Sequence, residues 1–410
     1  MTQAAARIVI ITTGHLAACP RMVKAADLLH AEGYDVTAIA VRHDGWAREL
    51  DDALRASRPW RSAVVDYSEA RELRRVWTGA RQRAAGAIVR AGLHRSAIAA
   101  RSLSRVVPEL VALARAESAA LYYGGATGTL AVLEQLASNG ARVAVDFEDA
   151  HGLEPLEHGD RLRAELVTGM EARVLQQARF STAAGAGVAG YYRNRHHADP
   201  TIINNVFRPH DVAPSAVPAH EPLRLYWFSQ TIGPRRGLEL VMAAARRAGC
   251  PLQLTMRGHD GEGYVRGLIE LAQREAPLLA VTHAPPAAPD DMVAAASSHH
   301  VGLSLEDEAI AHRAVCTPNK LFACLAAGLA VVATNTCGQA PILDDVGLGA
   351  CAITAGDAEA FGARLRHWHE HRASLDAARA AAHAAARRRW HFDHPLEAGR
   401  LIELVSSAVH

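Results

Sequence analysis

The segment Cys316-Thr317-Pro318-Asn319-Lys320 combines a lysine with the start of an expected helix. Thr317 is a favourable N-cap residue and Pro318 a favourable first helical residue, which places Lys320 at the third helical position. A cation at that position opposes the helix dipole by roughly 0.3–1 kcal/mol. An anion held by Thr317, Asn319, Lys320 and the free backbone N–H groups would explain this arrangement. A solvated lysine is the alternative interpretation.

A second basic group, Pro234-Arg235-Arg236-Gly237, lies between an expected strand at Leu223–Phe228 and an expected helix at Leu238–Ala248. Two guanidinium groups after a strand suit a diphosphate, because arginine presents a planar fork to paired oxygens. An exposed turn with solvated arginines is the alternative. Gly258 also follows an expected strand, where a glycine would let the backbone approach a ligand closely.

Polar residues follow two expected strands in the first half of the chain. One group comes after the strand Arg7–Thr12 and at the start of the next helix, and the other comes directly after the strand Arg142–Phe147. Carboxylates and imidazoles at such positions can serve as acids, bases or ligands of hydroxyl groups. Helix capping is the alternative role for Asp149. The candidates are Gly14, His15, Arg21, Glu148, Asp149 and His151.

Two common phosphate-binding motifs are absent, one from the loop after the first expected strand and the other from the whole chain. The loop after the first expected strand has no G-x-G-x-x-G, and the chain contains no G-x-x-x-x-G-K-[ST]. This argues against a dinucleotide fingerprint in the first strand–helix turn and against P-loop chemistry.

Composition narrows the class of protein. The 44 basic and 43 acidic side chains give a formal net charge of +1, which does not favour a general nucleic-acid binder. Six cysteines without a C-x-x-C pair suit a reducing compartment, and no metal site is expected from the histidine spacing. The longest apolar stretch, Leu321–Ala333, is shorter than the roughly 20 residues of a membrane span. We therefore expect a soluble, cytoplasmic protein without a signal peptide.

The elements that must position these residues alternate between short apolar runs and long helical segments. Many runs are apolar on both faces, as parallel strands covered by helices are, so we predict doubly wound parallel sheets. The thirteen expected strands are Arg7–Thr12, Asp35–Ala40, Ser62–Val65, Ala119–Tyr123, Ala141–Phe147, Arg179–Ala183, Thr201–Ile203, Leu223–Phe228, Pro251–Met256, Leu279–Thr282, His300–Ser304, Ala330–Thr334 and Ala350–Ile353.

Thirteen strands are too many for one comfortable open sheet, so we expect two Rossmann-like domains with a ligand-binding cleft between them. The break falls at 208–222, a stretch with four prolines and no periodicity, which we interpret as a hinge. The predicted boundaries are 1–207 for the first domain and 223–394 for the second. We expect residues 395–410 to form a last helix, which can cross back to the first domain.

Residues 71–105 are strongly basic, with nine arginines and a single acid, Glu72. Apolar residues such as Trp77 and Leu93 are interleaved in a helical pattern. Such a segment can lie on an anionic membrane surface. A solvated helical face is the alternative, and nucleic acid is a third possibility that the near-neutral overall charge weakens.

Three stretches resemble the GT-B glycosyltransferases of family 4. They are "YWFSQTIGPRRGLELV", "TPNKLFACLAAGLAVVATNTCG" and, near the N-terminus, "CPRMVKAADLLHAEGYDVTAIA". They are similar to the family patterns G-R-x(4–5)-K-G, P-N-K-L-F-E-Y-x-A-A-G-x-P-V-V and P-R-x(3)-A-x-x-L-x(3)-G-x-x-V. The resemblance implies that a sugar is transferred from a nucleotide diphosphate donor with retention of configuration, without a metal or other cofactor.

The resemblance also assigns roles to residues. The second domain would bind the donor, with Arg236 and Lys320 neutralising the diphosphate, and the first domain would bind the acceptor. Such an acceptor is lipid-linked or a membrane-associated glycan in many relatives, which implies an enzyme at the inner face of the plasma membrane. His151 matches the first-domain histidine that approaches the donor sugar. Glu306 and Glu308 lie where a loop could reach the donor ribose.

The sequence departs from the family pattern in its second domain. Ser229 and Gln230 replace the glycine and arginine of the G-R pair, and Val315 and Ala323 replace the two glutamates of the E-x(7)-E motif. Two alternatives therefore stay open. One is an inactive glycosyltransferase-like accessory subunit, and the other is a sugar-nucleotide 2-epimerase on the same fold.

Overall fold

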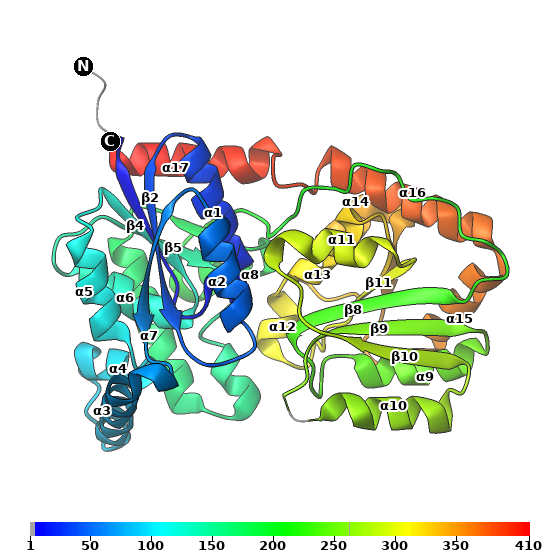
Figure 1. Cartoon of the computed structure of the whole chain (residues 1–410), viewed down its shortest axis with the longest axis horizontal. Helices are drawn as coiled ribbons and strands as arrows, with labels where there is room; N and C mark the ends of the chain where they lie inside the picture. Colours follow the sequence, from blue (N-terminus) through cyan, green and yellow to red (C-terminus); the bar gives the residue numbers. More distant parts are fainter. Residues whose placement is uncertain (1–4, 262) are drawn as a thin grey trace. The chain divides into compact units, whose positions relative to one another are not determined.

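The computed structural model describes residues 5–261 and 263–410, which divide into two compact units. The N-terminal unit comprises residues 5–184, 188–203 and 398–410, and the C-terminal unit comprises residues 185–187 and 204–397. Strands and helices alternate along both units (Figure 1).

The N-terminal unit is built on a seven-stranded sheet in the order β3-β2-β1-β4-β5-β6-β7, with parallel pairing throughout. The order reverses between β1 and β4, so these strands form the switch point of the sheet. The strands are β1 (Arg7–Ile11), β2 (Asp35–Arg42), β3 (Arg61–Asp66), β4 (Leu121–Gly125), β5 (Val143–Phe147), β6 (Ser181–Ala183) and β7 (Thr201–Ile202).

Helices cover both faces of this sheet, because β1 is apolar on both of its faces. Val9 and Ile11 pack in one cluster with residues of α4 to α8, whereas Ile8 and Ile10 pack in another with residues of α1 and α17. The helices are α1 (Pro20–Ala31), α2 (Arg48–Ser57), α3 (Glu72–Arg90), α4 (Ser96–Leu103), α5 (Val107–Ala116), α6 (Thr127–Ala137), α7 (Arg161–Gln177), α8 (Ala186–His196) and α17 (Arg400–Val409).

The C-terminal unit has a six-stranded parallel sheet in the order β10-β9-β8-β11-β12-β13, with its switch point between β8 and β11. The strands are β8 (Leu223–Thr231), β9 (Leu252–His259), β10 (Leu279–Ala284), β11 (Val301–Ser304), β12 (Ala330–Thr334) and β13 (Ala350–Ile353). The helices are α9 (Leu238–Ala248), α10 (Tyr264–Glu275), α11 (Met292–Ser297), α12 (Ala311–Val315), α13 (Asn319–Ala326), α14 (Ala340–Val346), α15 (Ala358–Glu370) and α16 (Arg372–Arg388).

The predicted fold class is confirmed: each of the thirteen expected runs overlaps a strand, and the strands form two parallel sheets. The main difference is that β8 runs to Thr231 instead of ending at Phe228. Its pairing with β9 is irregular between those two residues, so an apolar pattern alone could not mark the end of the strand. No helix in the described part of the chain is long and apolar enough to cross a membrane.

The proline-rich segment 208–222 is tied to the C-terminal unit. The backbone N–H of His210 donates to the carbonyl of Ala326 at 2.8 Å, and that of Val217 donates to the Asp376 carboxylate at 3.1 Å. Val217 is itself buried in the core of this unit. Its role as a hinge stays a prediction.

The long segment of the C-terminal unit begins at Asn204 and ends at Glu397, and these two residues contact each other. The backbone and side-chain N–H groups of Asn204 both donate to the Glu397 carboxylate, which also pairs with Arg389 at 2.7 Å. Glu397 is fully buried. The two ends of this segment are therefore held at one place by a satisfied buried carboxylate.

We predict that Val405→Asp strongly destabilises the N-terminal unit, because Val405 of α17 is fully buried with Ile8 and Ile10. Burying a carboxyl group there should lower the free energy of unfolding by more than about 3 kcal/mol. Hydrogen exchange should accelerate in β1 and α1. The matched control, Ser407→Asp on the exposed face of α17, should change stability by less than about 0.5 kcal/mol. Equal effects of the two substitutions would contradict this packing.

Candidate functional site

The switch point of the C-terminal sheet gathers charged residues from three elements. Arg236 follows β8, Glu306 follows β11, and Lys320 lies in the first turn of α13. The Lys320 Nζ atom lies 2.5 Å from Glu306 Oε1, and both side chains are buried. Open parallel sheets bind ligands at this location, outside the carboxyl ends of the strands where their order reverses.

The expected start of α13 is wrong by one residue. The helix begins at Asn319 with Pro318 in the N-cap position, where Pro318 has an extended backbone (φ −69°, ψ 141°). Thr317 does not cap the helix, because its buried hydroxyl donates to the carbonyl of Gly338 at 2.7 Å. Lys320 is therefore the second helical residue. The predicted end at Gly328 is confirmed by its φ of +71° after α13.

The solvated-lysine alternative is wrong, because only 7% of the Lys320 side chain is exposed. Its ammonium lies 5.6 Å from the centroid of the Trp227 ring in addition to its contact with Glu306. An ammonium has three N–H donors. A buried cation with one carboxylate partner, beside the first turn of a helix, is suited to receive a further anion.

The basic turn after β8 is fixed by close backbone packing. Arg235 has a φ of +59° and Gly237 a φ of +81°, and a Cβ atom on residue 237 would lie 2.4 Å from Leu305 Cβ. The buried guanidinium of Arg313 donates to the Arg235 carbonyl at 2.6 Å. Left-handed backbone at a non-glycine residue costs of order 1–3 kcal/mol and persists where the surroundings enforce it.

The remaining candidates of the C-terminal unit differ in exposure. Arg236 is half-buried and donates to Ser229 Oγ at 3.3 Å. Asn319 is half-buried, whereas Gln230 and Glu308 are exposed. Thus Arg236, Glu306 and Lys320 are held by the protein, and the two exposed side chains are available to solvent.

Gly258 has a structural explanation. A Cβ atom on residue 258 would lie only 2.3 Å from the Ser229 carbonyl oxygen, at the irregular pairing of β8 with β9. The absence of a side chain is therefore required by the neighbouring strand, with no need to invoke a ligand.

In the N-terminal unit, the buried His151 pairs with the half-buried Glu154. Its Nδ1 lies 2.6 Å from Glu154 Oε1, and the Thr127 hydroxyl lies 3.2 Å from the same nitrogen. Burial lowers the pKa of His151, but the Glu154 carboxylate outweighs burial and raises this pKa to about 9. The Nε2 atom is buried without a hydrogen-bond partner among the described residues. His151 is therefore a proton donor at neutral pH.

The two carboxyl groups before His151 are also perturbed. Burial raises the pKa of Asp149 to about 8, with a further increase from the charge of Glu154. Burial likewise raises the pKa of Glu148. Capping does not explain Asp149, because its carboxylate accepts the N–H of Ala150 at 2.8 Å and no α-helix begins there. Two carboxyl groups with raised pKa values beside an imidazole are typical of a proton-transfer site.

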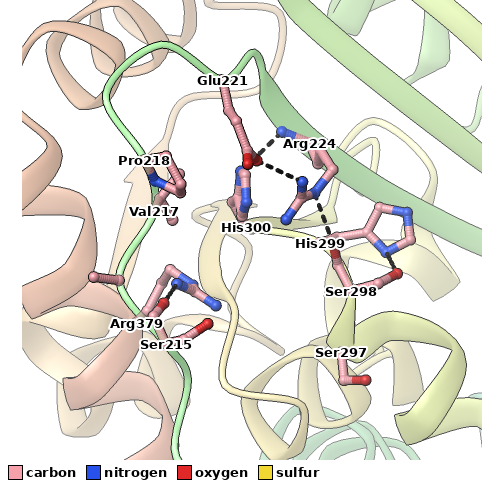
Figure 2. Close-up of a pocket in the computed structure, with 11 residues that line it drawn as sticks. Ser215, Val217, Pro218, Glu221, Arg224, Ser297, Ser298, His299, His300 and Arg379 are labelled. Carbon is pink, nitrogen blue, oxygen red and sulfur yellow. Dashed lines mark hydrogen bonds and ion pairs between the residues drawn. The ribbon is translucent and has the colours of Figure 1, made fainter.

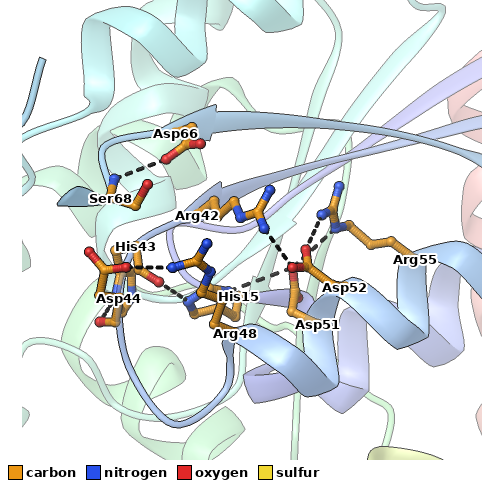
Figure 3. A network of polar contacts seen from close by, with 10 residues as sticks. All are labelled: His15, Arg42, His43, Asp44, Arg48, Asp51, Asp52, Arg55, Asp66 and Ser68. Atoms are coloured by element: carbon orange, nitrogen blue, oxygen red, sulfur yellow. Dashed lines mark hydrogen bonds and ion pairs between the residues drawn. The ribbon is translucent and has the colours of Figure 1, made fainter. Parts of the chain in front are cut away.

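Of the candidates after β1, His15 lies in a network of polar contacts with residues near β2 and α2 (Figure 3). His15 is buried, with Nε2 3.1 Å from the His43 carbonyl and Nδ1 3.6 Å from Asp51 Oδ2. Gly14 is half-buried and its carbonyl accepts the N–H of Val41. His15 therefore already has two contacts inside the unit.

Arg21 is committed to the core. Its guanidinium donates to both carboxylate oxygens of Asp146, at 2.6 and 2.7 Å, and to the carbonyl of Ile203. Only 6% of Arg21 is exposed. The bidentate pair ties α1 to β5, and the bond to Ile203 ties α1 to the residue after β7, an arrangement typical of a structural guanidinium.

Sequence reasoning missed Thr127, Glu154, Arg313 and a glycine run at 185–190. Glu154 follows His151 by three residues, and that spacing was the available signal. The run Gly185-Ala186-Gly187-Val188-Ala189-Gly190 has the form G-x-G-x-x-G and extends from the loop after β6 into the first turns of α8. Cβ atoms on Gly185 and Gly187 would lie 2.4 Å from Thr317 Oγ1 and 2.3 Å from the Val315 carbonyl oxygen, respectively. Close packing therefore accounts for these two glycines.

The C-terminal unit matches a known family. Residues 235–398 match the family model described as "Glycosyl transferase-like". No curated protein sequence matches the chain.

The whole chain is similar in structure to several enzymes. One is Alr3699/HepE of Anabaena in complex with UDP-glucose, with a TM-score of 0.69 and 14% identity, covering 98% of this chain and 100% of that one. Another is a glycosyltransferase from Rickettsia africae, with a TM-score of 0.65 and 10% identity, covering 99% of this chain and 99% of that one. A putative UDP-N-acetylglucosamine 2-epimerase from Listeria monocytogenes is also similar. Its TM-score is 0.60 and its identity 11%, covering 99% of this chain and 97% of that one. These likenesses establish the predicted fold, two parallel-sheet α/β domains of the GT-B type.

We predict that Glu154→Gln removes a pH-dependent contribution to stability. Because the pKa of His151 is raised from 6.5 to about 9 in the folded state, the pair stabilises fully below pH 6.5 and its contribution is lost as the pH rises through 9. The variant should be less stable than wild type by about 1.5–3 kcal/mol at pH 6, and the difference should shrink towards pH 10. Urea unfolding across this range measures it. Glu165→Gln, an exposed control in α7, should leave the profile unchanged, and parallel profiles for wild type and Glu154→Gln would argue against the pair.

Proposed function

We propose that this protein transfers a sugar from a nucleotide diphosphate sugar to an acceptor. The observation that carries the proposal is the buried Lys320 in the first turn of α13, at the switch point where the basic turn of Arg236 also lies. The match of residues 235–398 to a glycosyltransferase-like family supports it. So does the presence of UDP-glucose in the Anabaena relative.

In this proposal the protein's own cations stabilise the leaving diphosphate. Arg236, Lys320 and the free N–H groups at the start of α13 would receive the charge that develops on the diphosphate as the glycosidic bond breaks. We propose that the reaction retains the anomeric configuration and needs no metal, as the family 4 resemblance implies. The absence of an Asp-x-Asp motif from the sequence agrees with that proposal.

The structure refines which residues we propose for the donor. Glu306 is paired with Lys320, so its role would be to orient the ammonium towards the diphosphate. Glu308 is exposed and is the better candidate for the ribose hydroxyls. Thr317 would act through the backbone of its loop, because its hydroxyl is already used.

On the acceptor side we propose His151 and Asp149 as the proton-carrying groups. Both hold a proton near neutral pH, since the pKa of His151 is about 9 and that of Asp149 is about 8. The protonated imidazole, with its unpartnered Nε2, would donate a hydrogen bond to the transferred sugar. Glu148, Gly14 and His15 remain candidates for acceptor hydroxyls.

Two alternatives are separable by assay. A 2-epimerase, the activity named for the putative Listeria relative, would convert a sugar nucleotide without any acceptor. An inactive subunit, suggested by Val315 and Ala323 in place of the motif glutamates, would not turn over any donor. A donor screen with product mass spectrometry, with and without acceptor extract, distinguishes transfer from both.

We predict that the cations of the switch point carry nucleotide diphosphate binding. Arg236→Ala should weaken UDP binding about tenfold or more, because it removes a charge-assisted contact of about 1.5–3 kcal/mol. Lys320→Met alone would leave the Glu306 carboxylate buried and unpaired, which would also destabilise the fold. The double variant Lys320→Met with Glu306→Gln removes both charges, so a loss of UDP affinity in it reports on binding alone. Titration calorimetry with UDP measures both.

The control for this experiment is Arg266→Gln, which removes an exposed positive charge from α10. It should bind UDP as wild type does. Unchanged UDP affinity in both Arg236→Ala and the double variant would place the donor elsewhere and remove the basis of the proposal.

We further propose that α3 contacts an anionic membrane carrying the acceptor. The helix exposes an apolar stripe at helical spacing, with arginines such as Arg74, Arg83 and Arg90 on its flanks. Its opposite face is buried at Thr78 and Val89. An exposed apolar stripe between cationic flanks matches an interfacial helix. The exposed fractions of the stripe residues are 89% for Leu73, 56% for Val76, 64% for Trp77 and 39% for Ile88.

We predict that the protein binds vesicles only when they contain anionic lipid, and that salt weakens this binding. Arg83→Gln with Arg90→Gln should weaken binding by about 1 kcal/mol per charge, and Trp77→Ser should weaken it further. Arg81 is left intact because it pairs with Glu109 at 2.6 Å. Co-sedimentation measures partition, with Arg266→Gln as the matched charge control. Equal partition to neutral vesicles, or no partition to anionic ones, would exclude this contact.

A further inference from the structure

A polar cavity of about 580 Å³ lies at the amino-terminal ends of β8 and β11 (Figure 2). The residues before and at the start of these strands line it, together with α16 and the end of α11. The donor candidates follow the carboxyl ends of the same two strands, so the cavity is at the other edge of the sheet. The lining residues used below are Ser215, Glu221, Arg224, Ser298, His300 and Arg379.

Two arginines of the cavity are held in place by the protein. Arg224 donates to Glu221 at 2.7 Å and, through Nε, to the Ser298 carbonyl at 2.8 Å. Arg379 donates from Nη1 to the Ser215 carbonyl. The Arg379 side chain is only 6% exposed, and its Nε atom is buried without a partner among the described residues. The cavity therefore contains a guanidinium whose donors are incompletely satisfied.

A third arginine adds charge beside the cavity. Arg372 donates from Nη2 to the Glu221 carbonyl at 2.6 Å, while its Nε and Nη1 atoms are buried without partners in the described part of the chain. Among the described residues, the carboxylates that interact with these three arginines are Glu221 and Asp376, and Asp376 is 3.7 Å from Arg379. Three guanidinium groups thus face two carboxylates, which leaves positive charge in excess.

The pKa of the neighbouring His300 reflects this excess of positive charge. Burial and the charges of Arg224, Arg379 and Arg372 lower its pKa to about 3, so the imidazole is neutral. Burial also lowers the pKa values of Arg379 and Arg372, against the opposing effect of Asp376. An additional anion in the cavity would relieve both the unpaired charge and the unsatisfied N–H groups.

We propose that this cavity binds a small polar molecule through a phosphate or carboxylate group, at a site separate from the donor site. Guanidinium groups bind both oxyanions, and Ser298 supplies a hydroxyl group beside them. The volume lies in the range of about 300–1,000 Å³ that small-molecule sites occupy. Inorganic phosphate alone would leave most of it empty, so the anion is carried by a larger polar molecule.

The test uses the full chain and two probes, glucose 6-phosphate for phosphate and citrate for carboxylate, in titration calorimetry. Ser215→Glu places a carboxylate beside Arg379 at an exposed position, so it should weaken binding about tenfold or more without removing an existing side-chain contact. Ser215→Gln is the matched neutral control and should bind as wild type does. The probe that binds more tightly to wild type identifies the anion class.

A second pair of variants locates the binding. Arg379→Gln should also lose about tenfold in affinity, whereas Arg236→Ala, which alters the basic turn of the donor site, should not. Binding that Arg236→Ala abolishes and Ser215→Glu preserves would assign the anion to the donor site and overturn the proposal. Failure of wild type to bind either probe at millimolar concentration would overturn it as well.

Discussion

Strand pairing is parallel in both sheets, and this constraint decides where polar groups can gather. All strands of a parallel sheet end at one edge, so each strand–helix loop contributes its side chains there. In the C-terminal unit that edge receives Arg236, Glu306 and Lys320. The opposite edge receives the residues before and at the start of the strands, including His300 and Arg224. The two edges of this one sheet therefore carry different sets of side chains, and each set includes basic residues.

In both units, buried cationic side chains are each paired with a carboxylate. Lys320 is paired with Glu306, His151 with Glu154, and Arg21 with Asp146. Burying an ion costs several kcal/mol unless such a partner is present. The pairing fixes all three cations. Arg21 also donates to the Ile203 carbonyl, whereas the Nε2 atom of His151 is buried without a hydrogen-bond partner among the described residues. A group of this second kind is pre-organised for a ligand that completes its hydrogen bonds.

The strands were predictable because burial on both faces leaves continuous apolar runs, and helix boundaries followed from residues such as Gly328. The side-chain environments were not. Arg21 meets Asp146 across 125 residues of sequence, and local spacing carries no information about such a partner. Thr317 has the composition of an N-cap, but a tertiary contact with Gly338 recruits its hydroxyl. Gly258 and the glycines at 185–190 fit ligand-binding patterns, yet close approach of neighbouring backbone or side chains explains Gly185, Gly187 and Gly258.

The contact between Asn204 and Glu397 gives the chain the topology of one module inserted into another. Because the two ends of the 204–397 segment meet at a single carboxylate, the segment can be excised and replaced without stretching its junctions. Insertion at a point where the ends lie together is the arrangement that tolerates exchange of whole domains. Evolution or an engineer could thus recombine the C-terminal unit as a cassette, retaining Ala398–His410 as part of the recipient.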